Sequence, residues 1–402
     1  MLMKFPAIDV YQCRIFSTGL VALLISSIAA ILAGIYLGSA SDIIAYLPAL
    51  LILVPPSINM RGSISGVLAS RLASSMHLGG FEIAFSKKSI MGMNICASLA
   101  ISIIIAFALG IIVSAISAAF GFYGISPVDL VVISIISGLI SSLVVMGFTV
   151  LVILVSYRYE IDLDMIGSPA VTTIADLVTI PILIITALFV LGIDESLRML
   201  MIIPVAVLLI ASFYTAFRTD EDIHEICREM ILLLIPLAVI CTFAGIIYAE
   251  DLDMLVTFTV FLIILTPFTG CCGSIGGILC SRLATGMHMG EITPHLLPSR
   301  DILGHFILSY LYVLILMPFL ALLADYCAGI LGMNSPGPAV MLMICIITGL
   351  IVITFVNLVA YTTASISFRK GYDPDNFGIP VITSFIDLIG ATMLVTVIYL
   401  MI

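Results

Sequence analysis

The sequence predicts an all-α polytopic membrane protein built from two similar halves. Hydrophobic residues make up 62% of the 402-residue chain and charged residues only 9%, a far more apolar composition than is typical of a water-soluble protein. In addition, long stretches of the sequence recur at a constant offset of 211 residues. This period is too long for a solenoid repeat, so it indicates a duplicated domain.

Two pairs of segments carry the duplication. Residues 56–79 (PSINMRGSISGVLASRLASSMHLG) match residues 267–290 (PFTGCCGSIGGILCSRLATGMHMG) at 13 of 24 positions. At the same offset and without a gap, residues 156–177 (SYRYEIDLDMIGSPAVTTIADL) match residues 367–388 (SFRKGYDPDNFGIPVITSFIDL). A binding site is therefore expected where the two similar halves face each other.

The apolar runs predict eleven transmembrane helices, since a span needs about 20 apolar residues to cross about 30 Å of hydrocarbon. Runs of this length begin near Phe16, Asp42, Ser89, Val128, Ser168, Leu197, Met230, Met254, Ile302, Ala339 and Pro380. Five spans belong to a first repeat (1–193) and five to a second repeat (227–402). The segment between them (194–226) holds one linker helix and a cytoplasmic loop.

The positions of Lys and Arg predict how the spans are oriented. With the N-terminus in the cytoplasm, 13 of the 14 basic residues fall at cytoplasmic ends and only Arg198 lies outside, as the positive-inside rule requires. Five spans per repeat would invert the second repeat, and the linker helix restores its direction. We therefore expect parallel repeats related by a pseudo-two-fold axis along the membrane normal, in the cell membrane and with an extracellular C-terminus.

Two acidic residues fall deep inside predicted spans. Asp176 and Asp387 occupy equivalent positions, seven residues after the expected helix starts at Pro169 and Pro380. An ionisable side chain in the hydrocarbon costs at least ~3 kcal/mol and marks an ion path or a buried partner. A structural hydrogen bond could explain one such residue, but two equivalent ones favour a functional pair. Facing carboxylates repel unless a cation neutralises them, and such oxygen ligands suit Mg²⁺ or Ca²⁺.

The motif GSIxGxLxSRLA in the second span of each repeat indicates either close helix packing or a pore lining. Its small residues are Gly62, Ser63 and Gly66 in the first repeat and Gly273, Ser274 and Gly277 in the second. Glycines spaced by four let helices approach closely. Upstream prolines, Pro55, Pro56 and Pro267, can free carbonyl groups that line a cavity. Both interpretations remain open.

An acidic D-x-D turn precedes the last span of each repeat. Its residues are Asp162 and Asp164 in the first copy and Asp373 and Asp375 in the second. The turn is either a solvated loop or a cation site at the cytoplasmic mouth. The nine Cys lack the spacing of a metal motif, and the net charge of −10 argues against nucleic acid as a partner.

With these residues identified, the chain resembles the MgtE family of magnesium transporters. It is more similar to the animal solute-carrier type, in which two MgtE-like membrane domains are fused through an extra helix without cytoplasmic regulatory domains. The resemblance is carried by LASRLA (68–73) with LCSRLA (279–284) and by the patterns SPAVTTIADL and IPVITSFIDL. It implies that Mg²⁺ is the transported substrate and that Asp176 and Asp387 coordinate the hydrated ion.

The resemblance also implies further ligands and exposes one exception. Backbone carbonyls of Thr172 and Thr383 would face the ion, and Asp164 and Asp375 are the nearest matches to acidic residues at the family's inner mouth. The Asn and Gln common in the family's glycine motif are replaced by Ser63 and Ser65 in the first repeat and by Ser274 and Gly276 in the second, which leaves the ion selectivity open. The exception is Arg61, which occupies the position of Cys272 in the second copy. Because a cation in the pathway would oppose cation passage, we expect Arg61 to snorkel to the interface.

Three functions remain open from the sequence. The first is a channel or transporter for Mg²⁺ or a related divalent cation, with its pathway between the repeats. The second is an exchanger that couples Mg²⁺ to H⁺ or Na⁺. The third is a Mg²⁺-dependent membrane enzyme acting on a phosphorylated lipid, for which only Arg158 and Arg369 could hold the phosphate. We expect a transporter rather than an enzyme, and a monomer, because a duplicated chain closes its own pseudo-dimer.

Overall fold

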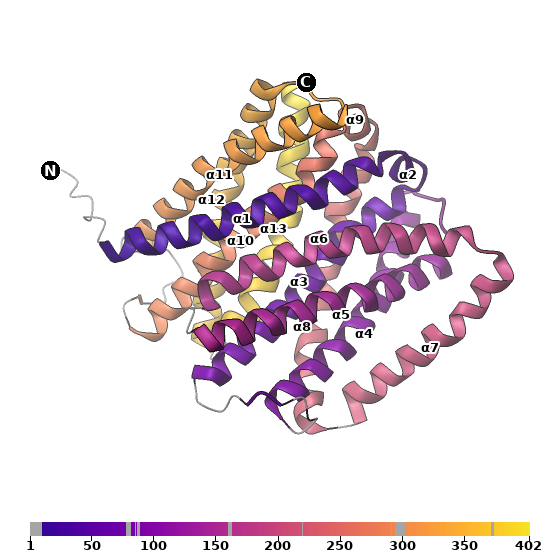
Figure 1. The fold of residues 1–402 in the computed structure, drawn as a ribbon, viewed down its shortest axis with the longest axis horizontal. Helices are drawn as coiled ribbons and strands as arrows, with labels where there is room; N and C mark the ends of the chain where they lie inside the picture. The colour runs from indigo at the N-terminus through magenta and orange to yellow at the C-terminus, as the bar shows by residue number, and fades with distance from the viewer. Residues whose placement is uncertain are drawn as a thin grey trace.

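The computed structural model contains helices, turns and short connections but no β-strand over the residues that it describes. These are residues 10–77, 82–84, 86, 89–159, 163–218, 220–290, 292–293, 302–370 and 374–402. Figure 1 shows the long helices packed side by side in one bundle, with the N-terminal helix α1 crossing the face of the second half. The prediction of an all-helical polytopic membrane protein is confirmed.

The helices repeat at the same offset as the sequence. The first half contains α1 (Val10–Ser39), α2 (Ser41–Tyr46), α3 (Pro48–His77), α4 (Ile90–Ala119), α5 (Pro127–Tyr159) and α6 (Leu163–Gly192), and α7 (Glu195–Arg218) follows it. The second half contains α8 (Glu221–Glu250), α9 (Leu252–Thr257), α10 (Val260–His288), α11 (Leu303–Leu331), α12 (Pro338–Lys370) and α13 (Pro374–Met401). Helices α8, α9 and α12 begin and end 211 residues after α1, α2 and α5.

In the described part of the chain, ten helices are long and apolar enough to span a membrane, and α3 is not among them. Helix α3 has 30 residues, but Asn59, Arg61 and the two prolines interrupt its apolar character. It contacts α4, α5, α6, α8 and α13, so much of its surface faces protein rather than lipid. This packing explains how a helix of lower hydropathy can occupy the position of the second of the eleven predicted spans.

The two halves exchange their first helices. Helix α1 packs against α10 and α11 of the second half, and α8 packs in the same way against α3 and α4 of the first half. Each contact requires a glycine: a Cβ on Gly34 would lie 1.9 Å from the carbonyl oxygen of Ile263, and a Cβ on Gly245 would lie 2.4 Å from that of Ile52. The same backbone approach therefore occurs twice, on both sides of the interface.

Several helices begin earlier than the sequence indicates. Helix α8 begins at Glu221, where the Asp220 side chain accepts a hydrogen bond from the backbone N–H of Asp222. Residues 221–226, which fall in the segment predicted to hold the cytoplasmic loop, are therefore helical. The predicted starts at Pro169 and Pro380 are also wrong, because α6 and α13 begin at residues 163 and 374. Buried helices in a bundle tolerate an internal proline when neighbouring groups satisfy the freed backbone.

Candidate functional site

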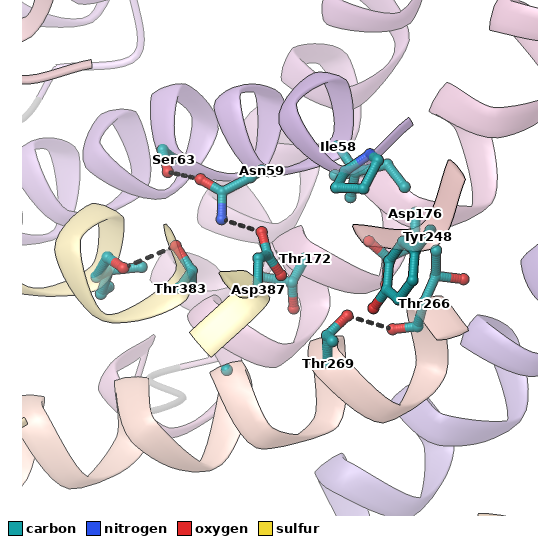
Figure 2. A pocket seen from close by; sticks show the side chains of 16 residues that line it. Ile58, Asn59, Ser63, Thr172, Asp176, Tyr248, Thr266, Thr269, Thr383 and Asp387 are labelled. Atoms are coloured by element: carbon teal, nitrogen blue, oxygen red, sulfur yellow. Dashed lines mark hydrogen bonds between the residues drawn. The ribbon is translucent and has the colours of Figure 1, made fainter. Parts of the chain in front are cut away.

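One cavity lies between the two halves of the chain. Helices α3 and α6 of the first half and α8, α10 and α13 of the second contribute its walls. The cavity volume open to water-sized molecules is about 50 Å³. The polar residues that line it are Asn59, Ser63, Thr172, Asp176, Tyr248, Thr266, Thr269, Thr383 and Asp387 (Figure 2). A cavity thus lies at the interface of the halves, where the duplication predicts a site.

Both predicted acidic residues line this cavity. Asp176 projects from α6 and is 5% exposed, and Asp387 projects from α13 and is partly buried. The two carboxylates are close enough to interact electrostatically. In a low-dielectric site this interaction is repulsive when both groups are ionised, so a bound cation would stabilise the pair.

Asp387 is held by donors from other helices. The Asn59 amide nitrogen on α3 donates to Asp387 Oδ2 at 2.7 Å, and the Cys241 thiol on α8 is a longer donor to the same oxygen, at 3.8 Å. The amide oxygen of Asn59 in turn accepts from the hydroxyls of Ser384, at 3.1 Å, and Ser63, at 3.4 Å. These bonds leave the Asn59 nitrogen directed at the carboxylate (Figure 2).

Asp176 has a different environment. It faces Gly270 on α10, where a Cβ would lie 3.0 Å from Asp176 Oδ2. No hydrogen bond to the Asp176 carboxylate is found among the residues that the structure describes. Two buried hydroxyls in the same cavity wall, Tyr248 Oη and Thr266 Oγ1, also have no partner within the described chain. The wall on this side of the cavity therefore contains buried oxygen atoms that no described protein group satisfies.

The glycine motif both packs helices and lines the cavity. A Cβ on Gly62 would lie 3.8 Å from the Thr172 methyl group, and a Cβ on Gly273 would lie 3.4 Å from the Thr383 methyl group. Gly62, Ser63 and Gly273 line the cavity. The other members are placed differently: Gly66 lies near Ile379, Ser274 is 1% exposed, and Gly277 is buried without lining the cavity.

Thr172 and Thr383, predicted from the family resemblance, also line the cavity. The Thr172 hydroxyl lies 3.2 Å from that of Ser274 on the opposite half, and the Thr383 hydroxyl donates to the carbonyl of Ile379 at 2.9 Å. Their hydroxyls are thus engaged with protein.

The structure describes only part of the two acidic D-x-D turns. Asp164 and Asp375 fall in the first turns of α6 and α13, but their side chains lie outside the described part of the structure. Asp162 and Asp373 also lie outside the described residues. A cation site at the inner mouth therefore remains a prediction.

The expectation that Arg61 snorkels to the interface is wrong. Arg61 is 4% exposed and does not line the cavity. Its Nε donates to Ser141 Oγ and its Nη1 donates to the Ser57 carbonyl, both at 2.5 Å, while Gly138 leaves room beside Nη2. Neutral acceptors on α3 and α5 thus hold the guanidinium inside the first half, away from the cavity lining.

Sequence reasoning missed four polar residues of the cavity, Asn59, Tyr248, Thr266 and Thr269. Asn59 could have been found as an amide inside a mostly apolar span, where an unsatisfied polar group is costly. Tyr248 carried no such signal, because its counterpart in the first repeat is Leu37 and its exposure to the cavity depends on the exchange of α1 and α8.

The cavity offers mainly oxygen ligands: two carboxylates, several hydroxyls and an amide. No group of three or more His, Cys, Asp or Glu residues that could hold a metal was found in the described chain. A site with two carboxylates and neutral oxygens is suited to a hard cation that keeps part of its water shell.

Comparisons with known proteins agree with this chemistry. The family model MgtE, described as a divalent cation transporter, matches residues 54–186 and again residues 265–397. The chain is 21% identical over 380 residues to solute carrier family 41 member 3 of Mus musculus, covering 86% of this chain and 74% of that protein. The protein of the same name from Rattus norvegicus is also 21% identical, with 86% and 78% covered. No solved structure matches the chain.

Proposed function

Because the chain belongs to the MgtE family of divalent cation transporters, we propose that it carries Mg²⁺ across the membrane between its two repeats. The observation that supports this proposal is the cavity at the interface of the halves, which is lined by the equivalent acidic residues Asp176 and Asp387. The family is one of transporters, so the protein is not an enzyme.

In the proposed site, Asp176 and Asp387 bind the hydrated cation, with the backbone carbonyls of Thr172 and Thr383 as further ligands. Mg²⁺ dehydrates reluctantly and is held through few protein oxygens plus water, which fits a cavity with only two carboxylates. Asp164 and Asp375 would form a second cation site near the cytoplasmic mouth, since they lie in the first turns of the helices that carry the central pair.

The proposed architecture has five spans in each repeat (1–193 and 227–402), with the segment 194–226 between them. The repeats are parallel, and their pseudo-two-fold axis runs along the membrane normal. The reciprocal packing of α1 on α10 and of α8 on α3 supports such an axis. The distribution of basic residues supports a cytoplasmic N-terminus and an extracellular C-terminus. One chain supplies both halves of the cavity, so we propose that the monomer is the transporting unit.

The membrane potential can drive this transport without a coupled ion. An inside-negative potential supplies ~2.3 kcal/mol per charge per 100 mV, and Mg²⁺ carries two charges. The proposed direction is therefore inward.

The test is Mg²⁺ flux into liposomes that contain the purified full-length chain. Asp176→Asn and Asp387→Asn each keep the shape of the side chain but remove its charge, so each should abolish flux. Asp253→Asn makes the same chemical change at an exposed position of α9 and should leave flux unchanged. Full Mg²⁺ flux in the Asp176/Asp387 double variant, at normal yield and thermal stability, would contradict the proposed site.

A further inference from the structure

The two carboxylates of the cavity are equivalent in sequence but not in their surroundings. The residue that contacts Asp387 from the opposite half is Asn59, and the residue at the same place in the second repeat, 211 positions later, is Gly270. Gly270 faces Asp176 in turn, but with no side chain. The two repeats thus place an amide donor next to Asp387 but only a glycine backbone next to Asp176.

The hydrogen bonds of Asn59 fix its orientation. Its amide oxygen lies within hydrogen-bond distance of the Ser384 and Ser63 hydroxyls. An ionised carboxylate can only accept, so the amide nitrogen is the atom that points at Asp387. The bond of 2.7 Å to Asp387 Oδ2 is at the short end of the range for nitrogen donors to carboxylates. Asn59 therefore fixes the position of Asp387, while its own amide oxygen is hydrogen-bonded to protein and is not a ligand for the cation.

On the other side, Gly270 places no donor next to Asp176. A Cβ there would lie 3.0 Å from Asp176 Oδ2, so the carboxylate occupies the space that a side chain at this position would take. Asp176 instead shares the cavity with the unpartnered hydroxyls of Tyr248 and Thr266. Buried polar atoms without a partner are costly, and a cation with its water shell would satisfy them.

We propose that the carboxylates have different roles: Asn59 fixes Asp387 as a rigid acceptor for the cation's water shell, and Asp176 is the mobile carboxylate that engages the cation. This proposal rests on the proposed function. Asn59 is a positioning residue for selectivity, because Mg²⁺ requires near-octahedral geometry, whereas Ca²⁺ accepts flexible and more numerous ligands. An anchored Asp387 favours hydrated Mg²⁺; a released Asp387 can bind Ca²⁺ directly.

The experiment measures Mg²⁺ flux into liposomes and its inhibition by external Ca²⁺ for the full-length chain. Asn59→Ala removes the donor, so we expect Mg²⁺ uptake to persist with a selectivity for Mg²⁺ over Ca²⁺ about ten-fold lower, the size expected for a hydrogen bond to a charged group. Asn94→Ala is the matched control: Asn94 is also buried, but it donates to the Ile90 carbonyl on α4, outside the cavity. Its Mg²⁺/Ca²⁺ selectivity should not change.

A second variant covers the case in which Asn59→Ala fails to fold. Asn59→Asp is isosteric but presents an acceptor to Asp387, so the repulsion should release that carboxylate and reduce selectivity at least as much. Folding of each variant is checked by its thermal unfolding temperature in detergent.

The results separate this proposal from the proposed function. If both Asn59 variants fold and keep the wild-type Mg²⁺/Ca²⁺ ratio while Asp176→Asn and Asp387→Asn abolish flux, the role of Asn59 is refuted and the transport site stands. If the wild-type chain shows no Mg²⁺ flux, the proposed function itself fails. A loss of selectivity in Asn94→Ala equal to that in Asn59→Ala would also overturn the proposal, because it would reflect a general loosening of the bundle.

Discussion

The two halves of this protein share one arrangement of helices but differ in the side chains that they bury. Their helices begin at matching positions, and the central acidic residues Asp176 and Asp387 line one cavity. Yet the first half buries Arg61 where the second has Cys272, and it presents Asn59 where the second has Gly270. Duplication therefore explains where the cavity lies, and divergence between the copies explains its internal chemistry. Variants that alter one copy at a time test both statements.

The helix contacts that occur in both halves predict the largest effects on stability. Gly34→Ala and Gly245→Ala each place a methyl group against a backbone carbonyl of the opposite half, at 1.9 Å and 2.4 Å. Helix backbones cannot yield as a flexible side chain can, so each change should lower the free energy of unfolding by about 3 kcal/mol. Thermal unfolding can be followed with a thiol-reactive dye, because most of the described cysteines are free and buried.

Gly147→Ala is the control for these two variants. Gly147 lies on α5 with nothing within 4 Å of an added Cβ, so alanine should be neutral or stabilise the helix by up to about 1 kcal/mol. If Gly34→Ala and Gly245→Ala behaved like Gly147→Ala, the reciprocal exchange of α1 and α8 would be incorrect.

The buried guanidinium of Arg61 predicts an effect of intermediate size that only the first half can show. Ser141→Ala removes the acceptor of its Nε, leaving a buried charged donor unsatisfied at a cost of about 1–3 kcal/mol. Arg61→Met replaces the cation by an apolar side chain of similar length, which is often neutral or stabilising. The unfolding temperature should therefore fall in Ser141→Ala alone.

The double variant Ser141→Ala with Arg61→Met tests whether Ser141 stabilises the protein through its hydrogen bond to Arg61. Without the guanidinium, the loss of the Ser141 hydroxyl should have little further effect, so the two changes should be strongly non-additive. Additive effects would mean that Ser141 stabilises the bundle independently of Arg61.

Much of this arrangement was predictable from the sequence, because the duplication and the apolar runs are local patterns. The offset of 211 residues located equivalent helices, and the cost of a buried acid singled out Asp176 and Asp387. Helix starts were less predictable, since Pro169 and Pro380 were expected to begin helices that in fact start at residues 163 and 374. Such prolines can lie within a helix when the surrounding bundle satisfies the backbone.

The internal environment of the cavity could not be predicted, because it depends on contacts between distant segments. Asn59 and Asp387 are 328 positions apart, and no local pattern pairs them. Arg61 was expected at the interface on charge alone, but Ser141 on another helix and the space beside Gly138 allow it to remain buried. Sequence periodicity indicates which face of a helix is apolar; it does not show which neighbour covers that face.

The smallest expected effect comes from a third difference between the halves. Arg71 on α3 forms an ion pair with Glu229 on α8 at 3.1 Å, with side-chain exposures of 18% and 49%, and the counterpart of Glu229 in the first repeat is Thr18. Glu229→Thr copies that counterpart and should lower the free energy of unfolding by at most about 1 kcal/mol, because water and salt screen an exposed pair. Thermal unfolding at low and high salt measures this contribution, and the difference from wild type should shrink as salt rises. A larger, salt-independent loss would instead mean that this pair holds the exchanged helix α8 in place, a role that the close backbone contact at Gly245 is expected to fill.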